Sequence, residues 1–157
     1  MWYRRACVLV LIALGASARP EGITNNLQVL DEKAARQVAD GVVADVIAQR
    51  HKALLERMEG VFQKEHSEGL VPSALDPIFA YGGRPLEAEF KAVDQGQKLY
   101  LDGRRKPLLK FWYAVRTTKS EKGKYFMFVE VVPDGSRLAC TTLSIVSFFN
   151  GVPPHLR

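Results

Sequence analysis

Apolar side chains recur every three or four residues between Asp31 and Ser67, a stretch with almost no turn residues. Asp31 is a suitable N-cap, and Glu32 lies where the positive end of a helix favours an acid. The spacing predicts one long helix over 31–67, with Gly41 as the natural place for a kink or break. The stripe consists of Val43, Ile47, His51, Leu54, Met58 and Val61.

A second, shorter helix is predicted over 72–82. Proline followed by serine suits a helix start, and Gly82-Gly83 supplies the stop. Its apolar side is formed by Leu75, Ile78 and Phe79.

After Pro85 the apolar period changes to two. The alternation over 86–93 predicts a half-buried strand, and the QKLYL stretch at 97–101 is its expected hairpin partner. Three longer strands are expected over 108–118, 124–132 and 137–149, separated by the turn sequences KSEKG and PDG. Two helices followed by a curved antiparallel sheet of four to five strands define an α+β fold.

Both faces of the predicted sheet are apolar. A two-residue turn at Asp134-Gly135 would pair Val131 with Leu138. Two helices can cover only one face, and each large aromatic residue left exposed forgoes roughly 2–3 kcal/mol of burial. We expect the other face to be covered by a second copy in a two-fold dimer or by another envelope protein; the alternative is the chain's own tail, 147–157. The expected interface residues are Trp112, Phe126, Phe128, Leu143 and Ile145.

Three segments carry a resemblance to a known superfamily: ALLERMEGVFQKEHS at 53–67, FAYGGRPLEAEFK at 79–91 and YFMFVEVVPDGSRLAC at 125–140. In element order and pattern the chain resembles the cone-shaped, cystatin-like fold of the nuclear transport factor 2-like superfamily, including its exported bacterial domains of unknown function. The resemblance implies a pocket between helix and sheet. It does not choose a function, because the superfamily includes isomerases, dehydratases, transport factors and assembly modules.

The first 18 residues have the composition of a secretory signal. A basic MWYRR head precedes an apolar run too short to span a bilayer, and the small residues ASA follow at 16–18. We expect cleavage near Ala18, a single domain over 19–157, a periplasmic or secreted location and no stable membrane insertion afterwards. Losing Arg4 and Arg5 lowers the net charge of +5 by two, which leaves too small an excess to indicate a nucleic-acid partner.

Cys140 is the one cysteine outside the predicted signal, so no internal disulfide is expected. The alternating apolar residues around it predict a buried, inert thiol. The sequence has no HExxH pattern, glycine-rich phosphate loop or GxSxG elbow. No metal or cofactor is therefore expected.

His51 is the candidate acid–base residue, because it falls on the apolar stripe and an imidazole can exchange a proton near neutral pH. A catalytic role requires a converging carboxylate, for which Asp94 is the main candidate and Glu130 and Glu89 are others. The alternative is a structural histidine satisfied by one hydrogen bond.

An amphipathic pocket could be lined by five side chains that join an apolar body to a polar tip, namely Tyr81, Arg84, Tyr100, Trp112 and Tyr113; the alternative is ordinary packing. Arg116, on a central strand, needs a carboxylate or an anionic ligand if it is buried, whereas at a strand end it reaches water. We therefore expect an exported, non-enzymatic binding or protein-interaction module that takes a small amphipathic ligand. The alternative is a small isomerase or lyase that uses His51. A cystatin-like inhibitor is a third possibility, but its closest string, QVADG at 37–41, lies in a predicted helix. The candidate ligand-binding residues are Tyr81, Arg84, Tyr100, Tyr113 and Arg116.

Overall fold

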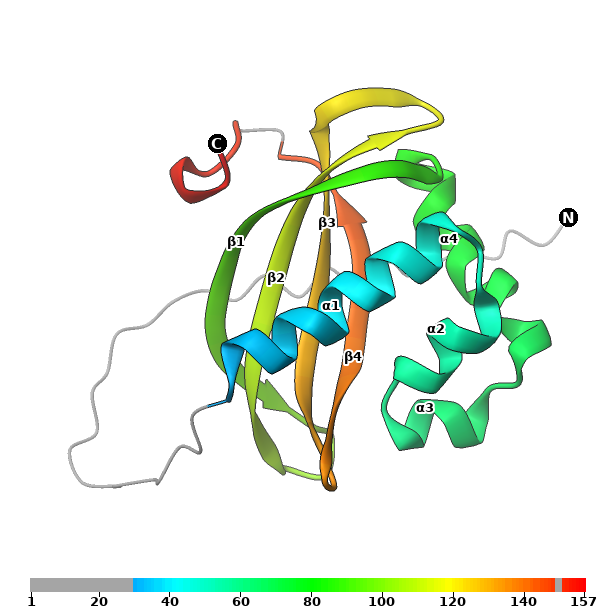
Figure 1. The fold of residues 1–157 in the computed structure, drawn as a ribbon, viewed down its shortest axis with the longest axis vertical. Coiled ribbons are helices and arrows are strands. Elements are labelled where there is room, and N and C mark those ends of the chain that lie inside the picture. The colour runs from blue at the N-terminus through cyan, green and yellow to red at the C-terminus, as the bar shows by residue number, and fades with distance from the viewer. Residues whose placement is uncertain (1–29, 149–150) are drawn as a thin grey trace, which may run out of the picture.

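The computed structural model describes residues 30–148 and 151–157, so the predicted signal segment and its cleavage site lie outside the described residues. Helices precede a four-stranded sheet along the chain (Figure 1). None of the described helices is long and apolar enough to cross a membrane. The helices are α1 Glu32–Ile47, α2 His51–Arg57, α3 Gly60–Glu65 and α4 Val71–Gly82, with a 3-10 turn, η1, at Glu68–Leu70.

The prediction of one long helix over 31–67 is wrong, because the chain breaks twice in this stretch. α1 begins as expected: the Asp31 carboxylate accepts hydrogen bonds from the N–H groups of Lys33 and Ala34, at 2.9 and 3.2 Å. It continues through Gly41 and ends at Ile47.

The first break is a turn at Gln49, whose φ of 56° lies in the left-handed region. The turn lets a buried carboxylate in α1 pair with two arginines that follow it. Asp45 is only 1% exposed and lies 2.7 Å from Arg50 Nη2 and 2.6 Å from Arg57 Nε. These contacts hold α2 against α1.

The second break is at Met58 and Glu59, which reach the edge of the sheet. Met58 is extended, with ψ 162°, and forms an isolated parallel bridge with Cys140. The Glu59 N–H donates to the Cys140 carbonyl at 2.9 Å. The spacing of apolar residues does not reveal this break. Met58 is buried beside the strand, and an apolar residue at this position is equally typical of the inner side of a helix.

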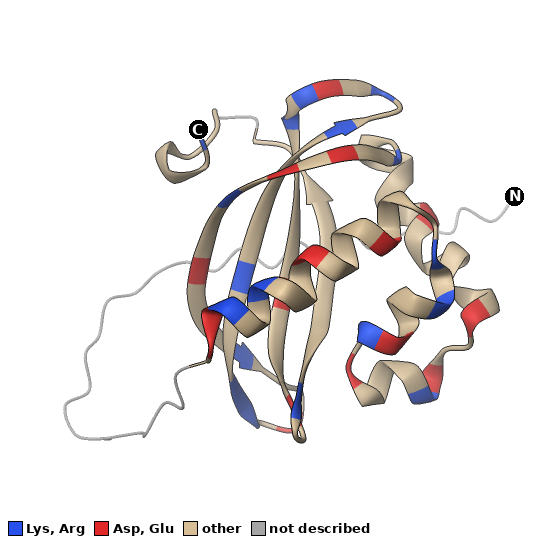
Figure 2. Cartoon of the chain, viewed as in Figure 1, with Lys and Arg blue, Asp and Glu red and all other residues tan. Residues whose placement is uncertain are grey.

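The sheet is an antiparallel meander in the order β1-β2-β3-β4, curved and open (Figure 1). The 97–101 segment is not a separate hairpin strand: residues 97–99 belong to β1, whose partner is β2. Most of the charged residues of the sheet lie on β1 and near the hairpin ends (Figure 2). The strands are β1 Pro85–Leu99, β2 Arg105–Thr117, β3 Ser120–Asp134 and β4 Arg137–Val146.

The β3–β4 register differs from the expected one by two residues. Asp134 pairs with Arg137, so the turn consists of Gly135 and Ser136. Val131 consequently pairs with Cys140 instead of Leu138. A shift of two keeps these side chains on the expected face, because successive strand residues alternate between faces.

A bulge at Thr141 then reverses the faces along the rest of β4. The pair Val131–Cys140 is followed by Glu130–Thr142, which leaves Thr141 without a partner in the ladder. As a result Leu143 and Ile145 pack in the core beneath the helices, whereas the prediction placed them on the opposite face with Trp112.

α1 lies across one face of the sheet and contacts all four strands (Figure 1). The small side chains Ala35 and Ala39 are fully buried on its inner side and allow close approach to the sheet. The largest fully buried residues of this helix-side core are Phe111, Met127, Val42, Val46, Val115, Val129 and Val131.

The opposite face is covered in part by the chain's own tail, one of the two alternatives raised by the sequence. Leu156, in the 3-10 turn η2 (Pro154–Leu156), is 1% exposed and packs with Ala114 and Phe126. Further along this face, Glu130 Oε2 lies 3.3 Å from Lys98 Nζ, and its Oε1 lies 3.0 Å from Lys110 Nζ. This face therefore has an apolar end beneath the tail and a charged middle.

Candidate functional site

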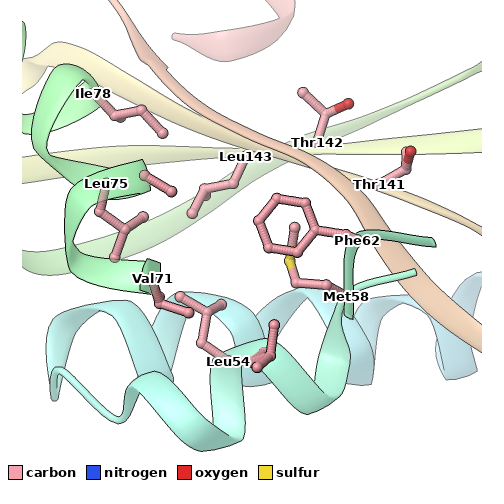
Figure 3. Close-up of a pocket in the computed structure, with 11 residues that line it drawn as sticks. Leu54, Met58, Phe62, Val71, Leu75, Ile78, Thr141, Thr142 and Leu143 are labelled. Carbon is pink, nitrogen blue, oxygen red and sulfur yellow. The ribbon is translucent and has the colours of Figure 1, made fainter. Parts of the chain in front are cut away.

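An apolar pocket of about 220 Å³ lies where α2, α3 and α4 meet β4 (Figure 3). Side chains from all four elements point into it, and no charged residue lines it. The lining residues are Leu54, Leu55, Met58, Phe62, Val71, Ala74, Leu75, Ile78, Thr141, Thr142 and Leu143.

The two irregularities that the sequence did not predict build this pocket. Because the chain leaves α2 at Met58 and restarts at Gly60, α3 carries Phe62 to the side of the pocket away from α4 (Figure 3). The Gly60 N–H donates to Asp134 Oδ2 at 2.9 Å, which fixes the start of α3. The bulge in β4 turns Leu143 toward the same space.

Phe62 is held in place by His66, the residue that follows α3. Its ring stacks on His66 with the ring centroids 4.0 Å apart, and His66 Nδ1 lies 3.1 Å from the Phe62 carbonyl oxygen. The pocket wall on this side is therefore an oriented aromatic ring.

The hydroxyl groups at the pocket edge are used elsewhere. Thr142 points away from the cavity (Figure 3), and its Oγ1 accepts a hydrogen bond from Lys98 Nζ at 2.8 Å on the opposite face of the sheet. A group that enters the pocket meets carbon and sulfur atoms first. The pocket accordingly favours an uncharged, apolar occupant, since an unpaired polar group would lose its hydration there.

A polar groove adjoins the pocket, and Phe62 and Thr141 line both. Glu59, 7% exposed, accepts hydrogen bonds from Tyr100 Oη at 2.7 Å and Lys106 Nζ at 2.9 Å. Burial alone would raise the pKa of Glu59, but hydrogen bonds from Thr141, Tyr100 and Lys106 outweigh it and lower the pKa. Burial and the Glu59 carboxylate raise the pKa of Tyr100. The groove thus contains an ionised carboxylate with its partners in place.

The structure does not bring the candidate acid–base pair together. His51 opens α2 and lines a shallow groove with Glu56 and Glu68, outside the apolar pocket. Asp94 lies on the face of the sheet that bears Trp112, whose Nε1 donates to Asp94 Oδ2 at 2.6 Å.

The two other carboxylates proposed for His51 also have partners of their own. Glu130 pairs with lysines on the tail-side face. Glu89 pairs with Lys91 and Lys122, and hydrogen bonds from these two lysines lower its pKa to about 2. Neither group lines the groove that contains His51.

The five candidate ligand-binding residues are spread over the molecule instead of lining one site. Tyr81 Oη lies 2.7 Å from Ser147 Oγ, and Tyr100 donates to Glu59. Tyr113 is buried in the helix-side core and donates to Asp40 Oδ1 at 2.8 Å. Burial and the Asp40 carboxylate raise the pKa of Tyr113.

The two arginines of that set lie at the surface. The Arg84 N–H donates to Thr118 Oγ1 at 3.1 Å, where the chain enters β1. Arg116 forms an exposed ion pair with Glu87. Neither guanidinium lines the apolar pocket.

Three of the five expected interface residues share the tail-side face. The rings of Trp112 and Phe128 are 5.1 Å apart between centroids and are half-buried, and Phe126 is buried beneath the tail. Leu143 and Ile145 belong to the helix side, as described above.

Cys140 is fully buried, as the sequence predicted. Burial raises the pKa of its thiol to about 12, so the sulfur stays protonated at neutral pH. Within residues 30–148 and 151–157, no group of three or more His, Cys, Asp or Glu residues is placed to hold a metal ion.

Sequence reasoning identified Leu54, Leu75 and Ile78 as apolar helix positions but did not assign them to a pocket. Phe62 and Thr141 were missed altogether. The available signal was the Glu59-Gly60 pair inside the predicted long helix, because glycine weakens a helix interior. No protein-family model, curated protein or solved structure matches the chain.

Proposed function

We propose that the chain is an exported, non-enzymatic binding module that holds a small apolar molecule, or the apolar part of an amphipathic one, in the pocket between α2–α4 and β4. One observation carries the proposal: a pocket of about 220 Å³ lined almost entirely by carbon and sulfur atoms, with no charged side chain in its wall. A pocket of this kind binds by removing apolar surface from water.

The size of the pocket sets the class of ligand. A dry apolar cavity of about 150 Å³ accepts benzene. A pocket of about 220 Å³ has room for one aromatic ring with a short substituent, or for a short alkyl chain. The adjoining groove, with Glu59 and Tyr100, offers polar surroundings to whatever part of the ligand extends past Phe62.

Two features support the fold resemblance that goes with this proposal. A helix packs across one face of a curved antiparallel meander, as in cone-shaped cystatin-like folds, and a pocket lies between helices and sheet. The nuclear transport factor 2-like assignment is part of the proposal, as are the signal segment and export.

A ligand titration that compares the wild-type protein with a pocket-filling variant tests the proposal. Ala74 lines the pocket, whereas Ala80 lies at the surface of the same helix. We expect propylbenzene, an uncharged aromatic ring with a short alkyl chain, to bind the wild-type protein in calorimetric titration, and Ala74→Phe to weaken binding at least about tenfold, or about 1.4 kcal/mol. Ala80→Phe should bind like the wild type.

The titration has two results that would refute the proposal. The first is the absence of saturable propylbenzene binding by the wild-type protein. The second is equal weakening by Ala74→Phe and Ala80→Phe, since the second variant leaves the pocket unchanged. Circular dichroism of both variants establishes that they are folded.

A further inference from the structure

The hairpin between β1 and β2 ends in apolar side chains that face water. Leu99 is 62% exposed and Leu101 is fully exposed. Val61 of α3 is 60% exposed and lines the same groove as Leu101. Among the described residues, three of the five exposed large hydrophobic side chains thus lie at this end of the molecule, a clustering that is typical of an interaction surface.

The same hairpin is basic. Residues 98–106 contain Lys98, Arg104, Arg105 and Lys106 but only one acid, Asp102. Figure 2 shows Lys and Arg at the end of the sheet where β2 begins. The hairpin therefore combines exposed leucines with an excess of positive charge.

The basic side chains of the hairpin differ in whether they pair with the body of the protein or lie at the exposed tip. Lys98 and Lys106 turn toward the protein, where they pair with Glu130 and Glu59. Arg104 pairs with Asp102 on the exposed tip, at 2.6 Å, and its side chain is 66% exposed. Within the described part of the chain, Arg105 has no ion-pair partner.

We propose that the tip of the β1–β2 hairpin docks on an anionic lipid surface. Leu99 and Leu101 enter the boundary between headgroups and acyl chains, and Arg104 and Arg105 contact the anionic headgroups. Apolar side chains together with basic ones are what peripheral attachment to anionic membranes requires.

The chemistry of the tip fits a lipid surface better than a protein partner. Protein interfaces are commonly anchored by aromatic side chains seated in pockets of the partner. The aromatic residue of this hairpin, Tyr100, is turned inward to Glu59 instead, and the protruding side chains are aliphatic. The docking proposal does not depend on what the apolar pocket holds.

Flotation of the protein with lipid vesicles tests this surface. The chain from residue 19, which keeps every described element, is mixed with vesicles of phosphatidylcholine alone or of phosphatidylcholine and phosphatidylglycerol in equal parts. We expect binding to the anionic vesicles that weakens as salt is added. Leu101→Ser should weaken it about tenfold, and Arg105→Gln about fivefold on the anionic vesicles only.

Leu70→Ser is the matched control, because Leu70 is also exposed, at 50%, but lies in η1 outside the hairpin. It should bind vesicles like the wild type, and so should the pocket-filling variant Ala74→Phe. The proposal is overturned if the wild type does not float with anionic vesicles. It is overturned in the same way if the protein binds an acidic protein but no vesicle. It is also overturned if Leu70→Ser weakens binding as much as Leu101→Ser.

Discussion

Glu59 links three parts of the chain through one carboxylate. Its backbone N–H donates a hydrogen bond to the Cys140 carbonyl in β4. Its side chain accepts hydrogen bonds from Tyr100 and Lys106, which lie on the two sides of the turn between β1 and β2. A buried carboxylate is costly unless its hydrogen bonds are complete. Here they are complete, and among the described residues no buried side-chain nitrogen or oxygen lacks a partner.

Glu59→Gln should lower the free energy of unfolding by about 2 kcal/mol at neutral pH, because a charge-assisted network loses its charge. Folding lowers the pKa of Glu59 below its ordinary value of 4.5. The ionised group therefore stabilises the fold above that pH, and the stabilisation is lost as the pH falls through the folded value. Urea denaturation of both proteins over this pH range should show the difference shrinking in acid.

The matched control is Glu65→Gln, which changes an exposed acid that lines the same groove. Its stability should stay within about 0.5 kcal/mol of the wild type. A constant difference between Glu59→Gln and wild type from neutral to acid pH would show that the charge of Glu59 does not stabilise the fold.

Asp45 is the second residue whose role depends on burial. Its carboxylate, almost fully buried, pairs with Arg50 and Arg57, whose own side chains reach solvent. Asp45→Asn should cost about 2 kcal/mol of stability, because two charge-assisted contacts are lost while both arginines can hydrate. Thermal denaturation measures the loss; an unchanged melting temperature would mean that the pair does not hold α2 against α1.

At the scale of elements, the start of α1 at Asp31, the stop of α4 at Gly82-Gly83 and the three longer strands were predicted, because local chemistry decides them. The break at Met58 and the bulge at Thr141 were not. Both depend on pairing between segments far apart in the chain, and apolar periodicity does not record such pairing. The residues that line the pocket were missed for the same reason, since both irregularities build it.

Gly83 joins α4 to β1 with a positive φ of 84°, and a Cβ there would lie 2.9 Å from the hydroxyl oxygens of Thr117 and Thr118. Gly83→Ala should therefore destabilise the fold by about 2 kcal/mol or more, from left-handed strain and the clash together. Gly103 is the control, with φ 83° but nothing within 4 Å of the added Cβ. Gly103→Ala should cost only about 1 kcal/mol, and equal losses in chemical denaturation would mean that the clash has no cost.

At the scale of the whole molecule, the tail-side face is the surface for which self-association is predicted. Leu156 covers Ala114 and Phe126, while Trp112 and Phe128 stay half-buried beside them. The apolar pattern of the strands predicts cover for this face from a partner or from the tail, and the tail supplies part of that cover. A role for the remaining surface in a dimer or with another envelope protein stays a prediction.

Leu156→Ser should loosen the tail, cost about 2 kcal/mol of stability and uncover the aromatic rings beneath it. We expect sedimentation velocity to show more self-association than in the wild type as the protein concentration rises. Leu70→Ser changes an exposed leucine outside the tail and should behave like the wild type. Identical sedimentation of Leu156→Ser and wild type would mean that the tail does not protect this face.

The most direct test of the binding proposal is a methyl NMR titration of the wild-type protein with propylbenzene. If the molecule binds in the pocket, we expect the methyl signals of four lining residues to shift together and saturate: Leu54, Leu75, Ile78 and Leu143. Methyl signals of Val115 and Val129, deep in the core beneath α1, should stay in place. If the methyl signals of the pocket do not shift, or only signals outside it do, the proposal that the pocket binds an apolar molecule is wrong.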